Sequence, residues 1–295
     1  MNGTNANITV TPTNAACGAV VRGVDLTHAL GREQIAAIRS AWLAHQVLVF
    51  PAPTANNQPL QLDELERFAS TIGPFGVDPY FGSVPGHPNV AQVKRAADET
   101  TRIFAEAWHS DWSFLAAPPQ ATLLYGNLIP PIGGDTLFAN QYMAWDALPE
   151  ALKRQVAKKM GVHSARRGYS PQGSYGQSDK GRSMDIKYSE TAMATQLHPI
   201  ARVHPETGRA CLYLGDHAES IVGMDYDEGR ALIEELNALA IHPDLTYAHR
   251  WRPHEFIVWD NRCLLHRATS YNPFVEGRVV RRCTVLGEEP FRQAR

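Results

Sequence analysis

Short strand patterns separated by turns recur along the 295 residues of this chain, and this spacing limits its possible folds. Runs of β-branched and other apolar residues are typical of strands. They lie at 47–50, 121–128, 136–139, 201–203, 211–214, 246–251, 256–259 and 279–285. They do not alternate regularly with helices, as the strands of a doubly wound sheet do. We therefore expect an α+β fold with a mainly β core, a sandwich or barrel with helices packed outside.

Four segments have apolar residues at helical spacing, which predicts helices on the outside of this core. The segments are 32–43, 62–72, 143–160 and 227–240. The second ends at Gly73-Pro74, a typical helix stop.

Two segments lack both kinds of periodicity. The stretch 75–106 is irregular and rich in Gly and Pro, and the stretch 165–189 is rich in Gly, Ser and charge. Long loops inside compact domains are often binding loops or lids. Since there is neither an internal repeat nor a clear linker, we predict a single domain over 1–295, with loop insertions at about 75–106 and 165–189.

Composition and charge argue against several classes of protein. The formal net charge of −2 predicts neither a nucleic-acid surface nor an anionic-membrane surface. No apolar run approaches the length of a membrane span, and the first residues lack the pattern of a signal peptide. The four cysteines contain no CxxC pair, which favours free thiols in a reducing cytoplasm. No glycine-rich nucleotide-binding motif is present.

The chain contains a candidate metal site in His109-Ser110-Asp111 together with the distant His266. Two histidines and one carboxylate form the facial triad that holds Fe(II) and leaves positions open for a cosubstrate and O₂. Residues i and i+2 of a strand share a face, so an extended segment here would direct His109 and Asp111 into one cavity.

The His-x-acid spacing is common in this sequence, so context must select among its occurrences. It occurs at His109/Asp111, His204/Glu206, His217/Glu219 and His242/Asp244. The pairs that begin at His204 and His242 lie in predicted turns, and the pair at His217 has no apolar alternation around it. Only the first pair lies in an aromatic-rich run that can be extended.

Each feature also has a structural interpretation without function. A lone histidine in an apolar run, such as His266, is more often a satisfied core residue than a ligand. The segment 133–136 can be a hairpin turn alone. Arg278, Arg281 and Arg282 can form a solvated face, and tryptophans more often pack in cores than stack on substrates. Trp108, Trp112 and Trp259 are the tryptophans concerned.

Three motifs in one order make the pattern specific: WHSD at 108–111, GGDT at 133–136 and WDNRCLLHRA at 259–268. With them the chain resembles the Fe(II)- and 2-oxoglutarate-dependent dioxygenases of the taurine dioxygenase and dichlorophenoxyacetate dioxygenase family. The resemblance runs from about Val10 to Leu286. Segment 214–218 and the arginine pair near the end make the phenoxyacetate branch look closer.

The resemblance implies a double-stranded β-helix, or jelly roll, with flanking helices and a metal in its mouth. It implies an oxidoreductase whose cofactors are Fe(II), 2-oxoglutarate as cosubstrate, and O₂. His109, Asp111 and His266 would be the metal ligands. No catalytic residue is expected beyond this metal centre.

Two further residues match cosubstrate ligands of the family. Arg278 matches the arginine that binds the far carboxylate of 2-oxoglutarate, and the planar fork of arginine suits a carboxylate. Thr136 matches the hydroxyl that bonds the same carboxylate. Arg282 follows Arg278 by four residues, so both would face one side of a strand while Arg281 faces away. Arg282 matches an arginine that holds the anionic group of the substrate.

The resemblance leaves the substrate less defined than the reaction. Arg282 indicates a small anion, and we favour an aryloxyalkanoate-like acid, with hydroxylation leading in some cases to C–O cleavage. Asp78, Tyr80 and Trp112 are further candidates for substrate contacts. Asp78 and Tyr80 stand where taurine dioxygenase has a histidine-containing segment, which argues against taurine. An aspartate there would suit a substrate with a cationic group.

Three alternatives remain open. A taurine-type dioxygenase acting on sulfonates or alkyl sulfates would use the same motifs. A non-catalytic metal-binding jelly roll would not need Arg278 and Thr136. A zinc hydrolase would need a general base beside the metal-bound water, and we find no clear candidate. Partners beyond the small organic anion are not expected, apart from a homo-oligomer, which the resemblance suggests.

Overall fold

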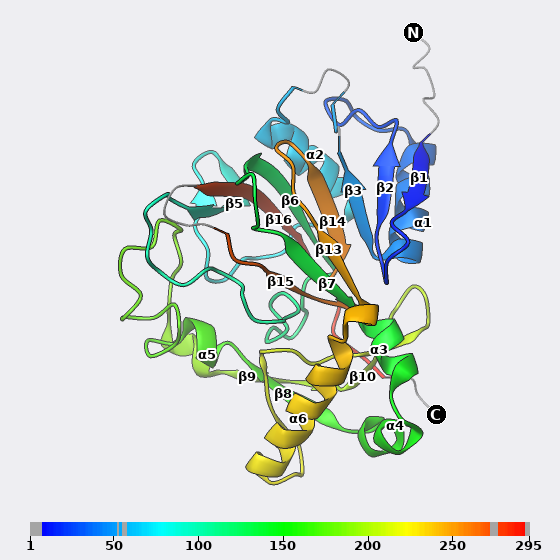
Figure 1. Cartoon of the computed structure of the whole chain (residues 1–295), viewed down its shortest axis with the longest axis vertical. Helices are drawn as coiled ribbons and strands as arrows, with labels where there is room; N and C mark the ends of the chain where they lie inside the picture. The colour runs from blue at the N-terminus through cyan, green and yellow to red at the C-terminus, as the bar shows by residue number, and fades with distance from the viewer. Residues whose placement is uncertain (1–7, 52, 55–57, 272–276, 293–295) are drawn as a thin grey trace.

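The computed structural model describes residues 8–51, 53–54, 58–271 and 277–292, and two β-sheets form its centre (Figure 1). The larger sheet contains, in spatial order, β1 (Thr9–Pro12), β2 (Ala19–Arg22), β3 (Val47–Phe50), β14 (Phe256–Asp260), β6 (Ala121–Leu128), β16 (Arg278–Val285), β5 (His87–Arg95) and β4 (Ser83–Val84). The smaller contains β13 (Thr246–His249), β7 (Thr136–Asn140) and β15 (Leu264–Ala268). Neighbouring strands in both sheets are antiparallel, except that β2 and β3 are parallel.

Apolar side chains from the two sheets pack against each other. Leu124, Ile257 and Val280 of the larger sheet share one core cluster with Phe138 and Leu264 of the smaller sheet. Alternate residues of a strand face opposite sides, so each strand contributes every second side chain to this core. This arrangement is the expected jelly roll, and the predicted fold class is confirmed.

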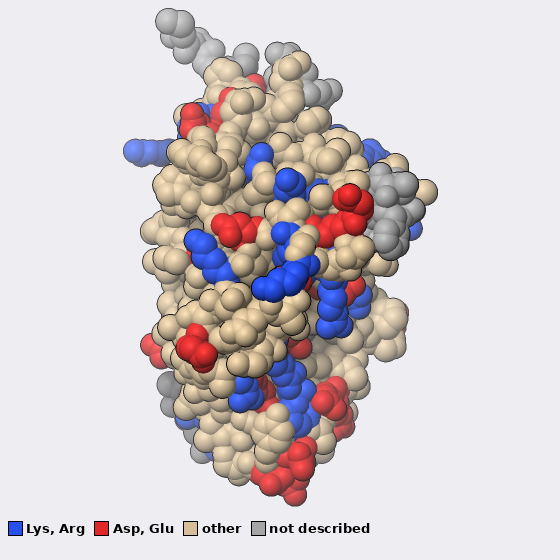
Figure 2. All heavy atoms as spheres, turned by 90° about the vertical axis from the view of Figure 1, so that its left-hand side faces the viewer, with Lys and Arg blue, Asp and Glu red and all other residues tan. Residues whose placement is uncertain are grey.

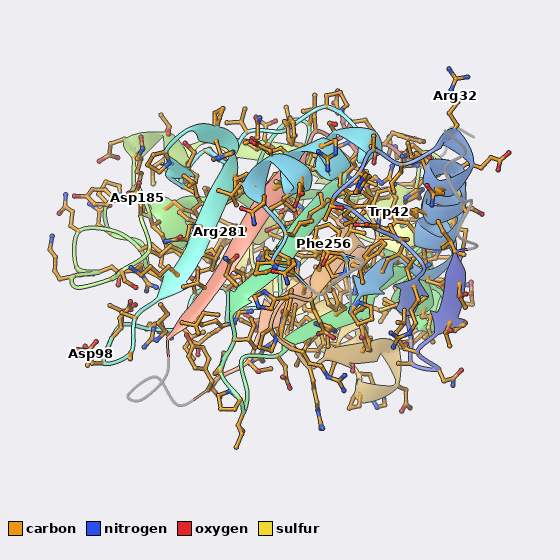
Figure 3. The ribbon with its side chains drawn as sticks, turned by 90° about the horizontal axis from the view of Figure 1, so that it is seen from above. Arg32, Trp42, Asp98, Asp185, Phe256 and Arg281 are labelled. Atoms are coloured by element: carbon orange, nitrogen blue, oxygen red, sulfur yellow. The ribbon has the colours of Figure 1, made fainter. Side chains whose placement is uncertain are left out.

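The outer face of the larger sheet is covered by α1 (Arg32–His45) and α2 (Leu62–Ile72) (Figure 3). Trp42 of α1 and Phe68 of α2 belong to the same buried cluster as Phe50 and Phe256 of the sheet. Both helices were predicted, because their apolar residues recur at the spacing that one buried face requires.

A second layer lies below the sheets in Figure 1. Its strands are β8 (Met160–Ser164), β9 (Thr195–Pro199), β10 (Ala201–Val203), β11 (Ala210–Leu212) and β12 (Ala218–Ile221), and its helices are α3 (Gln141–Ala147), α4 (Glu150–Val156), α5 (Arg166–Tyr169), α6 (Tyr226–Ala240) and the short η1 (Glu190–Met193) and η2 (Pro243–Leu245). The predicted helix at 227–240 is confirmed as α6, which packs on β12. No helix in the described part of the chain combines the length and apolar character of a membrane span.

The predicted helix over 143–160 is wrong. The structure has two helices, α3 and α4, with Leu148 extended between them and Pro149 at the N-cap of α4. A proline disfavours helical backbone in the residue before it, which explains the break. Met160 then begins β8 rather than ending a helix.

The predicted loop insertion at 75–106 is also partly wrong, because residues 87–95 form β5 and pair with β16. Pro88 and the polar residues around it concealed this strand near the edge of the sheet. The segment 165–189 contains α5 and is otherwise turns and irregular structure. Its Tyr169 and Met184 are nevertheless buried.

Candidate active site

The structure brings together the three predicted metal ligands at the open end between the sheets. His266 lies on β15, and the backbone N–H groups of His109 and His266 each donate to the other's carbonyl oxygen, at 3.0 and 2.8 Å. The expected extended strand is limited to this single bridge, since the chain turns at Trp112 with φ of 46°. The turn still directs Asp111 back toward both histidines.

The geometry of these three residues fits a metal ion. Asp111 Oδ1 lies 3.7 Å from His109 Nε2 and 3.8 Å from His266 Nε2. All three ligand atoms lie within 4.8 Å of one another, a spacing at which one metal ion can contact all of them. The donor set of two imidazoles and one carboxylate suits Fe(II) and leaves coordination positions open.

Hydrogen bonding and burial prepare the two imidazoles for a metal. His109 Nδ1 donates to the carbonyl oxygen of Ala107 at 2.8 Å, which orients the ring so that Nε2 faces Asp111. Burial, followed by the neighbouring His109, holds the pKa of His266 well below its usual range. A neutral imidazole is the form that binds metals.

A chain of hydrogen bonds fixes the Asp111 carboxylate. Trp259 Nε1 donates to Asn261 Oδ1 at 2.8 Å, Asn261 Nδ2 donates to Thr122 Oγ1 at 2.9 Å, and the Thr122 hydroxyl donates to Asp111 Oδ2 at 2.6 Å. This chain leaves Oδ1 facing the histidines. Burial alone would raise the pKa of Asp111. The opposite effect of the Arg282 guanidinium and the two histidines is larger in sum, so the pKa of this carboxyl lies well below its usual range.

Arg282 is engaged by acidic and hydroxyl partners. Its Nη1 donates to Asp111 Oδ1 at 3.1 Å. Its Nε donates to Thr284 Oγ1 at 3.3 Å and lies 3.5 Å from Asp78 Oδ1. Arg281 on the same strand instead bonds Gln92. The predicted alternation of β16 is therefore confirmed, but Arg282 is turned mainly toward the metal carboxylate.

Arg278 and Thr136 face a cavity beside the metal ligands, which we call the inner cavity. His109, Trp259, His266 and Arg282 also line it. Trp251 Nε1 donates to Thr136 Oγ1 at 2.9 Å, which leaves the Thr136 hydroxyl free to donate to a ligand. Arg278 Nε is buried with no hydrogen-bond partner among the described residues. Its burial lowers the pKa of Arg278, yet arginine remains charged, and this cation forms no ion pair with a residue that the structure describes.

The Gly133-Gly134 pair shapes the wall beside Arg278. Gly133 has φ of 77°, and a Cβ atom there would lie 2.5 Å from the carbonyl oxygen of Ser270. Gly134 has φ of 69°, and its Cβ position is 3.4 Å from Arg278 Nε. Glycine accepts these backbone angles and leaves room for the guanidinium.

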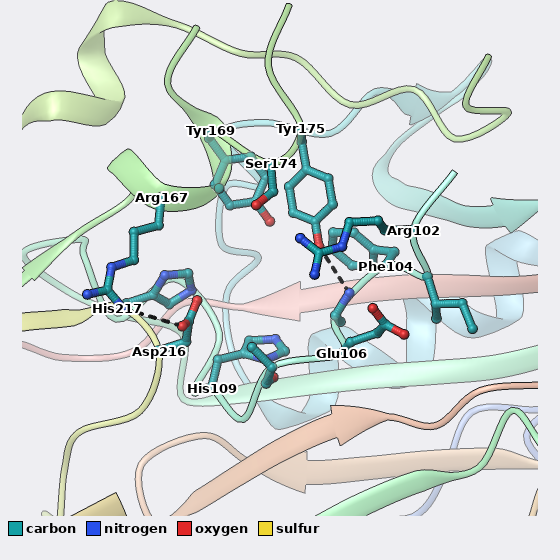
Figure 4. Close-up of a pocket in the computed structure, with 14 residues that line it drawn as sticks. Arg102, Phe104, Glu106, His109, Arg167, Tyr169, Ser174, Tyr175, Asp216 and His217 are labelled. Atoms are coloured by element: carbon teal, nitrogen blue, oxygen red, sulfur yellow. Dashed lines mark hydrogen bonds and ion pairs between the residues drawn. The ribbon is translucent and has the colours of Figure 1, made fainter. Parts of the chain in front are cut away.

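A second cavity of about 290 Å³, which we call the outer cavity, also has His109 in its lining (Figure 4). The segments 102–107, 167–169, 174–175 and 216–217 line it together with His109. Phe104, Tyr169 and Tyr175 supply aromatic wall, whereas Arg102, Glu106, Arg167 and Asp216 supply charge. Most of these residues lie in the predicted loop insertions 75–106 and 165–189, but the sequence analysis named none of them individually except His109 and His217, because only the folded loops bring them together.

Two contacts join the 165–189 segment to the rest of the outer cavity (Figure 4). The backbone N–H of Ala105 donates to the Tyr175 hydroxyl oxygen at 3.2 Å, and Arg167 Nη1 lies 3.7 Å from Asp216 Oδ1. His217 lies next to this ion pair, and burial with the nearby His109 lowers its pKa to about 4. The imidazole of His217 is therefore neutral at physiological pH.

The structure places Asp78, Tyr80 and Trp112 behind the cavity walls. Tyr80 stacks on Tyr169 with ring centroids 4.4 Å apart, and Trp112 Nε1 donates to Asp78 Oδ1 at 2.7 Å. None of the three is among the described residues that line the inner or outer cavity. The alternative interpretation of Trp112 as core packing fits its position better than direct substrate contact.

The other His-x-acid pairs do not form comparable sites. His204 Nε2 lies 3.0 Å from Asp260 Oδ2, but Arg262 already binds both oxygens of that carboxylate, at 2.8 and 2.7 Å. His242 caps η2 at the surface, and His217 has no acidic partner at metal-binding distance among the described residues. A further cluster of Asp63, Glu66 and His87 lies on the surface, away from both cavities.

Comparisons with known proteins agree with this geometry. The family model described as taurine catabolism dioxygenase TauD, TfdA family matches residues 9–284. An (S)-phenoxypropionate/alpha-ketoglutarate-dioxygenase of Delftia acidovorans is 36% identical over 89% of this chain and 90% of that protein. An alkylsulfatase of Acinetobacter baylyi is 33% identical over 92% of this chain and 82% of that protein. The crystal structure of a putative alpha-ketoglutarate-dependent taurine dioxygenase from Burkholderia xenovorans has a TM-score of 0.78 at 32% identity, covering 96% of this chain and 91% of that one.

Proposed function

The chain belongs to the TauD, TfdA family of dioxygenases, and from this we propose that His109, Asp111 and His266 hold the iron with which it hydroxylates an aryloxyalkanoate-like acid. Members of this family are oxidoreductases that use Fe(II), 2-oxoglutarate and O₂. The observation that carries the residue assignment is the cluster of His109, Asp111 and His266 beside one cavity. Both histidines line this cavity together with the Thr136 hydroxyl and Arg278, whose Nε has no hydrogen-bond partner among the described residues. A protein that only bound metal would not need the latter two groups.

The protein's own contribution is placement and exclusion of water. When bound, the iron centre supplies the oxidising chemistry that converts 2-oxoglutarate, O₂ and a substrate C–H bond into succinate, CO₂ and a hydroxylated product. His109 and His266 would bind the iron through Nε2, and Asp111 would bind it through Oδ1. The hydrogen bond that His109 Nδ1 donates to the Ala107 carbonyl oxygen and the one that the Thr122 hydroxyl donates to Asp111 Oδ2 keep these atoms aligned.

Arg278 and Thr136 are proposed to bind the far carboxylate of 2-oxoglutarate. The guanidinium offers a planar pair of N–H donors, and the hydroxyl of Thr136 is free to add a third hydrogen bond. Because Arg278 Nε lacks a partner among the described residues, an incoming carboxylate also satisfies a buried donor. Both gains favour a dicarboxylate in the inner cavity.

Arg282 is proposed as a positioning residue for the metal carboxylate. Its contact of 3.1 Å with Asp111 keeps that carboxylate ionised, and its position on a paired strand fixes the orientation of Oδ1. The predicted role of Arg282 in binding the substrate anion is compatible with this geometry. Its Nη2 is buried with no hydrogen-bond partner among the described residues, beside its contacts with Asp111 and Asp78.

The outer cavity supports a small organic anion with an apolar body as the substrate. Phe104, Tyr169 and Tyr175 offer aromatic surface, Arg102 offers a cation, and His109 connects this cavity to the metal ligands. The similarity of this chain to the (S)-phenoxypropionate/alpha-ketoglutarate-dioxygenase of Delftia acidovorans supports an aryloxyalkanoic acid as the substrate. If the hydroxylated carbon bears the ether oxygen, the product collapses with C–O cleavage.

An alkyl sulfate is the second candidate substrate, and the alkylsulfatase of Acinetobacter baylyi is the observation that favours it. A sulfate ester has the same combination of an anion and an apolar chain. Hydroxylation of the carbon next to its oxygen would release the sulfate group by the same collapse.

Substrate-dependent succinate formation tests this proposal. Purified enzyme with Fe(II), 2-oxoglutarate and O₂ would receive 2-phenoxypropionate, phenoxyacetate or hexyl sulfate, with taurine for comparison. We expect an aryloxyalkanoate to stimulate succinate formation most, together with release of phenol. Stimulation by hexyl sulfate alone would identify an alkyl sulfate, and not an aryloxyalkanoic acid, as the substrate. No response to any of these compounds would contradict the proposed substrate class.

The cysteines support a reducing compartment, and we propose that the enzyme works in the cytoplasm. All four are buried free thiols in the structure. Burial raises the pKa of both Cys17 and Cys211 to about 12, so these thiols stay protonated and unreactive. Activity that survives prolonged oxidation with a surface-limited disulfide reagent would be consistent with this burial.

A further inference from the structure

We propose that Glu99 is a positioning residue that closes the outer cavity by holding the segment 165–189 against the stretch 94–105. This inference rests on the proposed function and goes beyond it, because Glu99 is absent from the described residues that line either cavity. Both segments that Glu99 joins supply residues to the wall of the outer cavity. Glu99 therefore acts on the substrate through these neighbours, without touching it.

The Glu99 carboxylate accepts hydrogen bonds from both segments. In the segment 165–189, the backbone N–H of Ser183 donates to Oε2 at 2.9 Å, and the Ser183 hydroxyl donates to the same oxygen. In its own stretch, Oε1 accepts hydrogen bonds from the Thr101 hydroxyl and from Arg95 Nη1. Each carboxylate oxygen is therefore bound, and Glu99 bridges two parts of the chain that are far apart in sequence.

The middle of the segment 165–189 has few other attachments. Among the described residues, every hydrogen bond that leaves the segment from residues 174–183 ends on the stretch 94–105. Apart from those to Glu99, these bonds involve backbone groups of the stretch and come from Tyr175, Arg182 and Ser183. Within the described part of the chain, Glu99 is thus the side chain of this stretch that holds the segment by hydrogen bonds.

Glu99 is charged although it is only 5% exposed. Burial alone would raise its pKa, but the opposite effect of the hydrogen bonds from Ser183 and Thr101 and of the Arg95 charge is larger in sum, so the pKa lies below its usual range. Lys and Arg are interspersed with Asp and Glu on the surface of the face that carries both segments (Figure 2), where exposed ion pairs contribute little. Loss of the Glu99 charge would instead leave the buried Arg95 without its acidic partner.

The same contacts bring the aromatic walls of the outer cavity together. The Arg182 guanidinium lies 3.9 Å from Glu99 Oε1 through its Nη1 atom, and 5.1 Å from the centre of the Tyr175 ring. Tyr175 in turn packs against Phe104, with ring centroids 5.3 Å apart (Figure 4). Release of the segment from Glu99 would let these two rings separate and admit water to the cavity that contains His109.

The cosubstrate site does not depend on this bridge, because Thr136 lies on β7 and Arg278 on β16. An open outer cavity should therefore reduce substrate oxidation more than consumption of 2-oxoglutarate. In such uncoupled turnover, 2-oxoglutarate and O₂ still give succinate and CO₂. An added reductant such as ascorbate then supplies two electrons, and with two protons the second oxygen atom leaves as water instead of entering the substrate.

The yield of product per succinate tests the role of Glu99. Wild type and Glu99→Gln would receive 2-phenoxypropionate, 2-oxoglutarate and ascorbate, with phenol and succinate both measured. We expect Glu99→Gln to lower the ratio of phenol to succinate about threefold or more and to raise KM for 2-phenoxypropionate about fivefold or more, with KM for 2-oxoglutarate within about twofold. Glu234→Gln, at an exposed ion-paired glutamate of α6, is the matched control and should behave as wild type.

Hydrogen exchange tests the same bridge without substrate or metal. We expect Glu99→Gln to speed amide exchange in peptides that cover 174–183 about tenfold or more, while peptides from α6 keep their wild-type rates. Ser183→Ala removes one hydrogen bond to Glu99 but no charge, so it should give a smaller change in the same direction. This second variant provides the test if Glu99→Gln does not fold.

Wild-type exchange rates in 174–183 for a folded Glu99→Gln protein, or for Ser183→Ala if only that variant folds, would overturn the inference. A lower kcat in Glu99→Gln with an unchanged product ratio and unchanged KM values would also overturn it, since a general loss of stability gives that result. A wild-type enzyme that responds to neither 2-phenoxypropionate nor hexyl sulfate would overturn the proposed substrate class, whereas the exchange rates would still decide the role of Glu99.

Discussion

The inner and outer cavities share Phe104, Ala105 and His109, but their other walls are built from different kinds of structure. His266, Thr136 and Arg278 of the inner cavity all lie on paired strands. The outer cavity is lined mainly by the loop 102–107 and the segment that contains α5. Strands fix atoms to within tenths of an ångström, as metal binding requires, whereas loops can vary while the scaffold stays constant. The sheets therefore position His266, Thr136 and Arg278, whereas loops position most of the outer cavity.

The ion pairs of the two regions differ in the same way. Asp260, beside the metal-site network, is 1% exposed and is bound by Arg262 and His204. At the outer cavity, Arg167 and Asp216 are separated by 3.7 Å, with side chains 38% and 40% exposed. Breaking a buried pair leaves an uncompensated charge, whereas an exposed pair contributes little. Substitutions in the two regions should therefore have effects of very different size.

The largest effect is expected at the metal ligands. His266→Ala removes one of three ligands, and we expect succinate formation to fall by a factor on the order of a thousand or more, about 4 kcal/mol in the activation barrier. His242→Ala is the matched control, because this histidine is exposed and also begins a His-x-acid pair. Turnover in His266→Ala close to that of the control would contradict the assignment of the triad.

Protein stability should distinguish the two ion pairs. Asp260→Ala leaves Arg262 buried without its main partner, and we expect the free energy of unfolding to fall by about 3–5 kcal/mol. Asp216→Asn at the outer cavity should change it by less than about 1 kcal/mol. Urea unfolding followed by circular dichroism measures both. Equal destabilisation by the two substitutions would remove the distinction between a rigid and a tolerant region.

The sequence predicted the residues that meet at the inner cavity, partly from spacing and partly from the motifs of the family. The spacing of Arg278 and Arg282 gave a shared strand face, and the motif around His266 gave the third proposed metal ligand. For the outer cavity the sequence predicted only the two loop segments, since Arg102 and Tyr175 meet through the tertiary position of these loops. Strand β5 was missed because its pairing with β16, and not an apolar pattern of its own, makes it a strand. The helix predicted over 143–160 is broken because the local effect of Pro149 is stronger than the apolar pattern on both sides of it.

A smaller effect is expected for the cosubstrate anchor. Arg278→Gln removes the charge that faces the inner cavity, and we expect KM for 2-oxoglutarate to rise about 10- to 100-fold, or about 1.5–3 kcal/mol. Arg281→Gln, on the opposite face of β16, should leave that KM unchanged. Steady-state succinate formation at varied 2-oxoglutarate measures both, and an unchanged KM in Arg278→Gln would show that another cation binds the cosubstrate.

The smallest effect is expected at the contact between the two outer loops. Tyr175→Phe removes the hydroxyl that accepts from the Ala105 N–H at 3.2 Å but keeps the aromatic ring. We expect KM for 2-phenoxypropionate to rise by less than about fivefold, or below about 1 kcal/mol, with KM for 2-oxoglutarate unchanged. A rise in the 2-oxoglutarate KM would mean that the two cavities are more strongly coupled than their separate scaffolds suggest.

Anaerobic titration tests most directly whether the strand-built inner cavity is an iron and 2-oxoglutarate site. The wild-type protein with Fe(II) should develop a weak visible charge-transfer band as 2-oxoglutarate is added. Arg278→Gln should need about 10- to 100-fold more 2-oxoglutarate for the same band, and His266→Ala should not develop it. A band of wild-type strength and affinity in His266→Ala, or no band in the wild-type protein, would contradict the account.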